Sequence, residues 1–285
     1  MVSDTIKPVL IMITGMMFIP LGDAAGKLLI VNYGAAPQFV GWSRFFLGII
    51  FIMAVYLFRG FDLSILKNWR VWVRGVLVTG AISNILIALE TESLANTFAA
   101  FFIGPIVAYF VSALLLKEEI STSRTALLFF GFVGMLLVIK PGISFTIGTA
   151  HALLSGVFYG CFLVSTKWLA GVANARSLLV SHLMIGSFFM APIGLSNIPD
   201  LSNPTLIFLV LLSAIASAIG NLLLVMSNKM ADASMLAPLV YTQLISATVL
   251  GILIFGDVPD WISMVGLSML LFSGLYGFYQ KAKTL

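Results

Sequence analysis

The sequence predicts an all-α polytopic membrane protein whose ten transmembrane helices form two inverted five-helix repeats. Hydrophobic residues make up 60% of the 285-residue chain and charged residues 9%, with a mean hydropathy of +1.11, whereas soluble domains carry about 25% charged residues. Residues 9–143 resemble residues 149–281, and each copy holds five apolar segments. An odd number of spans per copy makes the second copy enter the membrane from the opposite side.

Each of the ten apolar segments is close to the roughly 20 residues that an α-helix needs to cross the hydrocarbon core. Proline, glycine and charge clusters separate the segments and mark the turns. In the first repeat, residues 1–143, the expected helices cover 8–30, 37–58, 69–89, 93–116 and 121–139. In the second repeat, residues 144–285, they cover 148–170, 177–195, 204–227, 232–256 and 260–280. No long segment outside these spans remains, so we expect no attached soluble enzyme domain.

Basic residues predict how the chain is oriented in the membrane. With both termini in the cytoplasm, twelve Lys and Arg residues, Arg74 among them, lie on the inner side. Only Lys27 and Lys140 then lie on the outer side, and Arg44 falls inside a span. The positive-inside rule favours this orientation. The net charge of +4 is therefore explained by membrane orientation, and we expect no nucleic-acid partner.

Short matches in the same order along both copies support the repeat. Residues 15–27 align with residues 155–167. Further aligned pairs are Asp23 with Leu163, Arg44 with His182, Asn84 with Asn221, and Pro105 with Gln243. Each match is weak alone, because small residues are common in membrane helices. Their collinear order indicates an internal duplication.

Asp23 is the only carboxylate that falls well inside a predicted span. A bare carboxylate in hydrocarbon costs several kcal/mol, so Asp23 needs a partner or a proton. Arg44 lies at a similar depth on the next span, about 10 Å below the outer surface at a rise of 1.5 Å per residue. We expect the pair to close the outer side of a cavity, with Asp23 exchanging a proton or a substrate cation for Arg44. Alternatively, Asp23 bridges Lys27 one turn away or holds Arg44 permanently as structure.

Three further polar residues within the spans are candidates for the transport path. His182 lies near the inner end of its predicted helix and, since histidine changes charge near neutral pH, is a candidate inner gate. A plain surface histidine at a helix end is the alternative. Asn84 and Asn221 are repeat mates, and we expect a paired amide site at the centre of the bundle. Such polar residues also hold membrane helices together.

Polar residues near the predicted outer surface have simpler interpretations. Glu90 and Glu92 lie in the turn between the third and fourth spans, where they either attract a cationic solute or form a solvated turn. His151 lies near the outer end of the sixth span, and we expect it at the membrane interface. Neither His151 nor His182 has the neighbouring ligands that a metal site needs.

Aromatic side chains share one face of the fourth predicted span, where Phe102 and Tyr109 recur at helical spacing, and Tyr159 adds a ring from the sixth span. Such faces suit a flat, partly apolar solute, although lipid contact and core packing also produce them. The candidate substrate-binding or gating residues are Asp23, Lys27, Arg44, Asn84, Phe102, Tyr109, Tyr159, His182, Asn221, Tyr241 and Gln243.

Three motifs make the chain similar to a known family. They are Phe18…Asp23-Ala24-x-x-Lys27, Arg44-Phe45 followed by Gly48, and Pro105 fourteen residues before Glu119. The chain resembles the EamA type of the drug/metabolite transporter superfamily, which implies a bacterial inner-membrane carrier of a small organic metabolite. The resemblance also implies a cavity formed mainly by helices one, three, four, six, eight and nine. The Asp-Ala-x-x-Lys form is similar to the branch that includes riboflavin and S-adenosylmethionine carriers.

We therefore expect a secondary transporter that moves a small organic metabolite, neutral or cationic and partly aromatic, by alternating access, with a proton gradient as a candidate driving force. The alternatives are a passive channel or facilitator, and a scaffold without turnover. One deep acid and a single cysteine, Cys161, argue against an intramembrane enzyme and a metal cluster. We expect no cofactor; the partners are the solute and the lipid bilayer, and the chain is a monomer or a homodimer.

Overall fold

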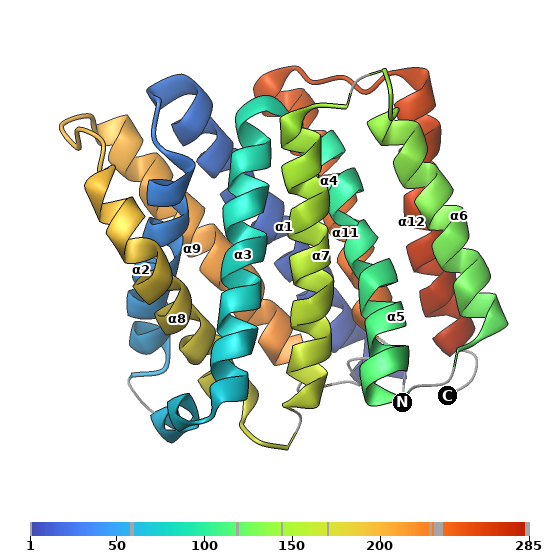
Figure 1. Cartoon of the computed structure of the whole chain (residues 1–285), viewed down its shortest axis with the longest axis horizontal. Coiled ribbons are helices and arrows are strands. Elements are labelled where there is room, and N and C mark those ends of the chain that lie inside the picture. The colour runs from blue at the N-terminus through green and yellow to red at the C-terminus, as the bar shows by residue number, and fades with distance from the viewer. Residues whose placement is uncertain are drawn as a thin grey trace.

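A computed structural model describes residues 2–57, 60–117, 120–143, 145–169, 171–227, 230 and 236–282. Within these ranges every regular element is a helix, and the helices form one bundle (Figure 1). In the described part of the chain, eight helices are long and apolar enough to cross a membrane, and Leu239–Phe255 and Trp261–Tyr276 form two shorter apolar helices. The expected all-α polytopic membrane fold with ten apolar helices is confirmed.

The helices of the first repeat are α1 (Val2–Tyr33), α2 (Pro37–Val55), the short η1 (Leu63–Lys67), α3 (Trp69–Thr91), α4 (Leu94–Phe101), α5 (Ile103–Leu116) and α6 (Thr122–Ile139). Those of the second are α7 (Ile147–Trp168), α8 (Ala175–Ser196), α9 (Pro204–Ser227), η2 (Ala237–Tyr241), α11 (Thr242–Leu250), the π-helical η3 (Gly251–Phe255) and α12 (Trp261–Ala282). The turns follow local chemistry: Gly34 and Gly256 adopt positive φ angles of 65° and 69°, which glycine tolerates without strain.

The fourth and ninth predicted spans, each of which contains a proline, are divided into separate helical segments in the described residues. The fourth divides at Phe102 into α4 and α5. Pro105, three residues later, lacks an N–H for the carbonyl of residue 101, and its ring crowds that carbonyl. In the described part of the ninth span, the 3₁₀ turn η2, which carries a proline in its first turn, precedes α11. Residues 232–235 of the predicted ninth helix lie outside the described residues.

The packing follows the inverted repeat. α1 packs against α9 as α7 packs against α3, and α2 packs against α9 as α8 packs against α3. Two further pairs join repeat mates: α2 packs against α8 at one edge of the bundle and α6 against α12 at the other (Figure 1). Glycine permits close approach, since a Cβ on Gly160 of α7 would lie 2.5 Å from the carbonyl oxygen of Gly104 in α5.

The two ends of the bundle carry different polar residues. The α3–α4 turn and the α6–α7 connection share one end, at the top of Figure 1, which we name the Glu92 end. The helix η1 and the start of α3 lie at the opposite end, which we name the Arg74 end. In the predicted orientation these ends face the outside and the cytoplasm.

Candidate functional site

Arg44 lies at the centre of a buried polar cluster between α1, α2 and α9. Its Nη1 donates to Asp23 Oδ1 at 2.5 Å, and its Nη2 donates to the Gly22 carbonyl at 2.7 Å. Its Nε donates to Ser213 Oγ at 2.8 Å, and that hydroxyl donates to the Gly22 carbonyl at 3.0 Å. Asp23 and Arg44 are only 3% and 6% exposed. All three guanidinium nitrogens therefore bind protein groups, and the charge is matched by a carboxylate.

Small residues around Asp23 make room for the guanidinium. Gly22, Ala24, Ala25 and Gly26 flank the carboxylate along α1. A Cβ on Gly26 would lie 2.4 Å from Arg44 Nη2. The sequence next to the acid is therefore shaped by the close approach of Arg44 from α2.

Lys27, one turn beyond Asp23 on α1, is engaged by other partners. Its Nζ donates to the Glu92 carbonyl at 2.7 Å and to Asp257 Oδ2 at 3.4 Å, and it lies 4.8 Å from the centre of the Phe255 ring. The structure therefore contains the Asp23–Arg44 pair and directs Lys27 to the α3–α4 turn and to the chain that follows η3.

The Glu92 side chain is buried at 6% exposure, so the expectation of a solvated turn is wrong for this residue, whereas Glu90 is exposed. Glu92 accepts hydrogen bonds from the hydroxyls of Thr146 and Thr149, the latter at 2.8 Å. These threonines form the capping box at the start of α7. Glu92 therefore joins the first repeat to the second at the same end as the Lys27 contacts.

An exposed ion pair lies at the rim of the Glu92 end. Lys140, after α6, pairs with Asp260, before α12. Asp260 also accepts from the backbone N–H of Ser263 at 2.8 Å. These hydrogen bonds, chiefly that from Lys140, lower the pKa of Asp260 to about 2. The pair fastens α6 to α12 and has no contact with Asp23 or Arg44.

A row of aromatic rings crosses the bundle at the helix interruptions. The rings of Phe102 and Tyr241 stack with centroids 4.5 Å apart and an interplanar angle of 8°. The ring centroids of Phe101 and Tyr159 of α7 lie 4.8 Å apart, and those of Tyr159 and Phe162 lie 5.7 Å apart. Phe102 and Tyr241 each stand where a span is interrupted, so the interruptions of the two repeats meet face to face.

The other amide and tyrosine candidates occupy separate places. Asn84 Oδ1 lies 2.7 Å from Nδ1 of His151, and Asn221 Nδ2 donates to the Ser217 carbonyl at 2.9 Å. The two asparagines share no hydrogen bond in the described part of the chain. Tyr109 closes the α5–α6 connection, because its hydroxyl accepts from the Ser121 backbone N–H at 2.9 Å. Gln243 is buried in α11, two residues after Tyr241.

At the opposite end, Arg74 and His182 are both buried, at 6% and 5% exposure. The alternative of a surface histidine is therefore wrong. Arg74, which the orientation assigned to the inner side, is buried within α3. Arg74 Nε donates to Thr166 Oγ1 at 2.8 Å and Nη1 to the Leu178 carbonyl at 2.9 Å. The guanidinium lies 4.5 Å from the centre of the Phe162 ring. The only sequence signal for this cluster was the position of Arg74 within a predicted span.

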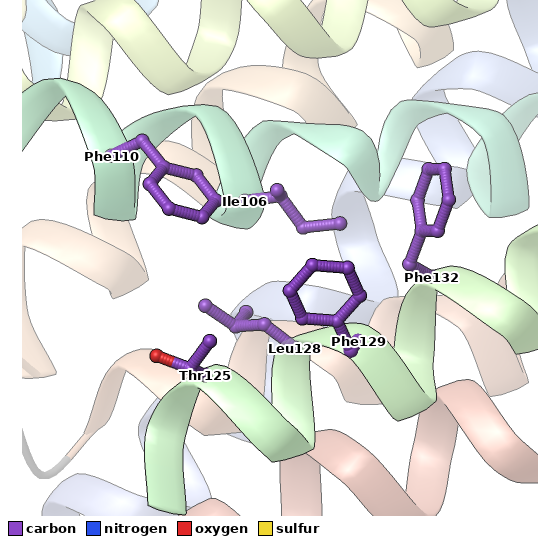
Figure 2. Close-up of a pocket in the computed structure, with 6 residues that line it drawn as sticks. All are labelled: Ile106, Phe110, Thr125, Leu128, Phe129 and Phe132. Atoms are coloured by element: carbon purple, nitrogen blue, oxygen red, sulfur yellow. The ribbon is translucent and has the colours of Figure 1, made fainter. Parts of the chain in front are cut away.

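Figure 2 shows an apolar groove of about 130 Å³ between α5 and α6. Its lining residues are Ile106, Phe110, Thr125, Leu128, Phe129 and Phe132. None of the candidate site residues lines it, and the exposure of Phe129 at 58% places it on the outer surface of the bundle. The groove is therefore separate from the polar clusters and from the aromatic row.

Within the described residues, ten apolar helices and charged residues buried between them define a polytopic membrane protein. The profile of the EamA-like transporter family matches the chain twice, over residues 6–140 and 146–279. The chain belongs to this family.

Characterised and uncharacterised relatives are consistent with this assignment. An S-adenosylmethionine uptake transporter of Rickettsia bellii is 24% identical over 259 residues, 86% of this chain and 85% of that protein. A riboflavin transporter of Rhizobium johnstonii is 24% identical, covering 80% and 77%. An uncharacterised transporter of Helicobacter pylori is 25% identical, covering 79% and 80%. A solved crystal structure matches 98% of both chains with a TM-score of 0.69 and 17% identity, which shows the shared fold.

Proposed function

We propose that this transporter is a secondary carrier of a small organic metabolite that works by alternating access in the cell inner membrane. Both termini face the cytoplasm in this proposal, since the basic residues gather on that side. Two relatives named for S-adenosylmethionine and riboflavin support a metabolite-sized, partly aromatic solute. Relatives named as transporters support a function in transport.

The observation that carries the proposal is the clamp on α1 at the Glu92 end. Asp23 and Arg44 hold α1 to α2 and, through Ser213, to α9. Lys27 holds α1 to the α3–α4 turn and to Asp257. A path to the Glu92 end along α1 requires both sets of contacts to break. In this proposal these contacts belong to a state closed at the Glu92 end, and the transport cycle opens it.

The stacked rings of Phe102 and Tyr241 provide the proposed contact surface for the solute. Interrupted helices in corresponding positions of the two halves mark binding sites in inverted-repeat transporters. A planar solute makes favourable offset or edge contacts with such rings. In this proposal the solute separates the Phe102–Tyr241 stack and lies beside Tyr159, between the two ends of the bundle.

Asp23 supplies the proposed link to a driving force. When the Glu92 end opens and Arg44 withdraws, a lone carboxylate between helices is costly, and a proton or a substrate cation replaces the guanidinium. Transport then depends on Asp23 and on the proton gradient. A passive facilitator or a scaffold needs no such exchange, so the dependence of transport on Asp23 distinguishes a carrier from both alternatives.

The test is counterflow in proteoliposomes of wild type, Asp23→Asn and the control Asp200→Asn, whose carboxylate lies in an exposed turn. The panel contains flavins, S-adenosylmethionine, amino acids, nucleosides and quaternary amines, with and without a proton gradient. We expect saturable counterflow of one class in wild type and the control, and its loss in Asp23→Asn. No saturable flux of any solute would contradict the carrier function. An unchanged rate and pH dependence in Asp23→Asn would contradict the exchange at Asp23.

A further inference from the structure

Arg74 is a buried cation without a carboxylate partner. Within the described ranges no Asp or Glu forms an ion pair with it, and its two hydrogen bonds, from Nε and Nη1, go to neutral oxygens. Its Nη2 donates to no described residue. Arg44 in contrast uses all three nitrogens and pairs with Asp23. A buried charge is retained at low cost only when it is paired, so Arg74 has unused capacity for an anion.

The inverted repeat shows which group is missing. The Arg44 cluster combines α1, α2 and α9, and its symmetry equivalent combines α7, α8 and α3, the helices that meet at Arg74. His182 stands where Arg44 stands, and Arg74 lies within one turn of the position aligned with Ser213. Leu163 stands where Asp23 stands, and its side chain is 37% exposed on the outside of α7. The second cluster therefore keeps a cation and lacks the acid.

His182 adds a second unpartnered donor or acceptor at the same place. It is 5% exposed, and its Nδ1 has no hydrogen-bond partner among the described residues. The nearby Leu178 carbonyl already accepts from Arg74 Nη1 at 2.9 Å and from Ser181 Oγ at 3.0 Å, which uses both of its lone pairs. Unpaired buried nitrogens are uncommon and require an explanation, such as a ligand that binds in another state of the protein.

The cluster is connected to the proposed solute position. The guanidinium of Arg74 lies 4.5 Å from the centre of the Phe162 ring. The His182 ring packs against the Phe162 ring in an edge-to-face arrangement, with ring centroids 6.2 Å apart. Phe162 continues the aromatic row through Tyr159 and Phe101 towards the Phe102–Tyr241 stack. A solute whose flat part lies on this row can extend a charged group to Arg74.

We propose that Arg74 and His182 bind an oxyanion, a carboxylate or a phosphate, carried by the transported solute. The inference rests on the proposed carrier function and narrows it: the solute is an organic anion or a zwitterion. The oxyanion occupies the place that corresponds to the carboxylate of Asp23 in the other repeat. Arginine suits this role because its planar fork binds carboxylate and phosphate through two parallel hydrogen bonds.

Equilibrium binding to the full chain in lipid nanodiscs tests this site with matched probes. S-adenosylmethionine is compared with its decarboxylated form, and flavin mononucleotide with riboflavin; acetate and inorganic phosphate supply the oxyanions alone. The variants are Arg74→Met, Arg74→Lys and His182→Phe. Arg70→Met is the matched control, since Arg70 lies one turn earlier on α3 and its guanidinium lies 4.5 Å from the centre of the Trp168 ring. Melting temperatures establish that each variant is folded.

We expect wild type and Arg70→Met to bind the oxyanion-bearing probe of one pair at least about tenfold more tightly than its mate, with this preference lost in Arg74→Met. We expect Arg74→Lys and His182→Phe to reduce the preference in part. If Arg74→Met does not fold, these two variants test the inference in its place. A wild-type protein that prefers no oxyanion overturns the inference. An Arg74→Met variant that keeps the preference also overturns the inference, because Arg74 then serves only to hold α3, α7 and α8 together.

Counterflow in the same preparations separates this inference from the carrier function. Saturable counterflow of a solute without an oxyanion, at unchanged rate in Arg74→Met, overturns the oxyanion site and leaves the carrier. Oxyanion binding that depends on Arg74, with no counterflow of any solute, overturns the carrier and with it the assignment of the anion to a transported solute.

Discussion

Replacing Asp23 by asparagine removes the charge partner of Arg44 and keeps the size of the side chain. The guanidinium, 6% exposed, retains its hydrogen bonds to the Gly22 carbonyl and to Ser213 Oγ. Breaking a buried ion pair by removing one partner costs about 3–5 kcal/mol. Because two partner groups remain, we expect the lower end, about 3 kcal/mol, which is roughly a hundredfold in an equilibrium constant.

A double-mutant cycle measures this coupling through equilibrium unfolding by SDS in mixed micelles. The proteins are wild type, Asp23→Asn, Arg44→Gln and the double variant. Each single variant should lose about 3 kcal/mol, and the double variant should lose little more, because the second change removes an already unpaired group. Losses that add to within about 0.5 kcal/mol would refute the reasoning. Asp200→Asn, in an exposed turn, should stay within about 0.5 kcal/mol of wild type.

Three further substitutions or conditions test the clamp and the rim. Gly26→Ala places a Cβ 2.4 Å from Arg44 Nη2. The crowding should destabilise the folded protein by about 1–3 kcal/mol and therefore lower its melting temperature. Glu92→Gln weakens the acceptor for two threonine hydroxyls and should cost about 1–3 kcal/mol in the same SDS assay, with Glu90→Gln as the exposed control. The lowered pKa of Asp260, about 2, contributes stability above about pH 4 that is lost as the pH falls towards 2. Melting curves of wild type should show this loss, and those of Lys140→Met should show less of it.

Span positions were predictable because length and hydropathy define a membrane helix without reference to its neighbours. Gly34, between the first and second predicted spans, and Gly256, at the end of the ninth, adopt positive φ angles of 65° and 69°. The position of the interruption in the fourth span was harder to predict from the sequence. Pro105 marks a weak point, but the break falls at Phe102, where the ring stacks on Tyr241 from the other repeat. Sequence spacing within one span contains no information on that partner.

The depth of charged residues was predictable only where the span boundaries decide it. Asp23 and Arg44 lie deep within their spans, and their contact follows from similar depth on adjacent helices. Glu92 sits at a turn, yet it is buried, because Thr146 and Thr149 of the other repeat bind its carboxylate. Arg74 lies near a span end and is buried by neighbours on α7 and α8. Burial at a helix end is thus determined by tertiary partners far away in the sequence.

Opening at the Glu92 end is the central claim, and the distance between α1 and the turn after η3 measures it directly. Spin labels at Val31 and Val258, which are 52% and 73% exposed, report this distance in a Cys161→Ser background. We predict one short distance population in wild type, and a second, longer population when Asp23→Asn and Lys27→Met together release both sets of contacts. An identical single distribution in wild type and the double variant would contradict the claim that these contacts hold the end closed.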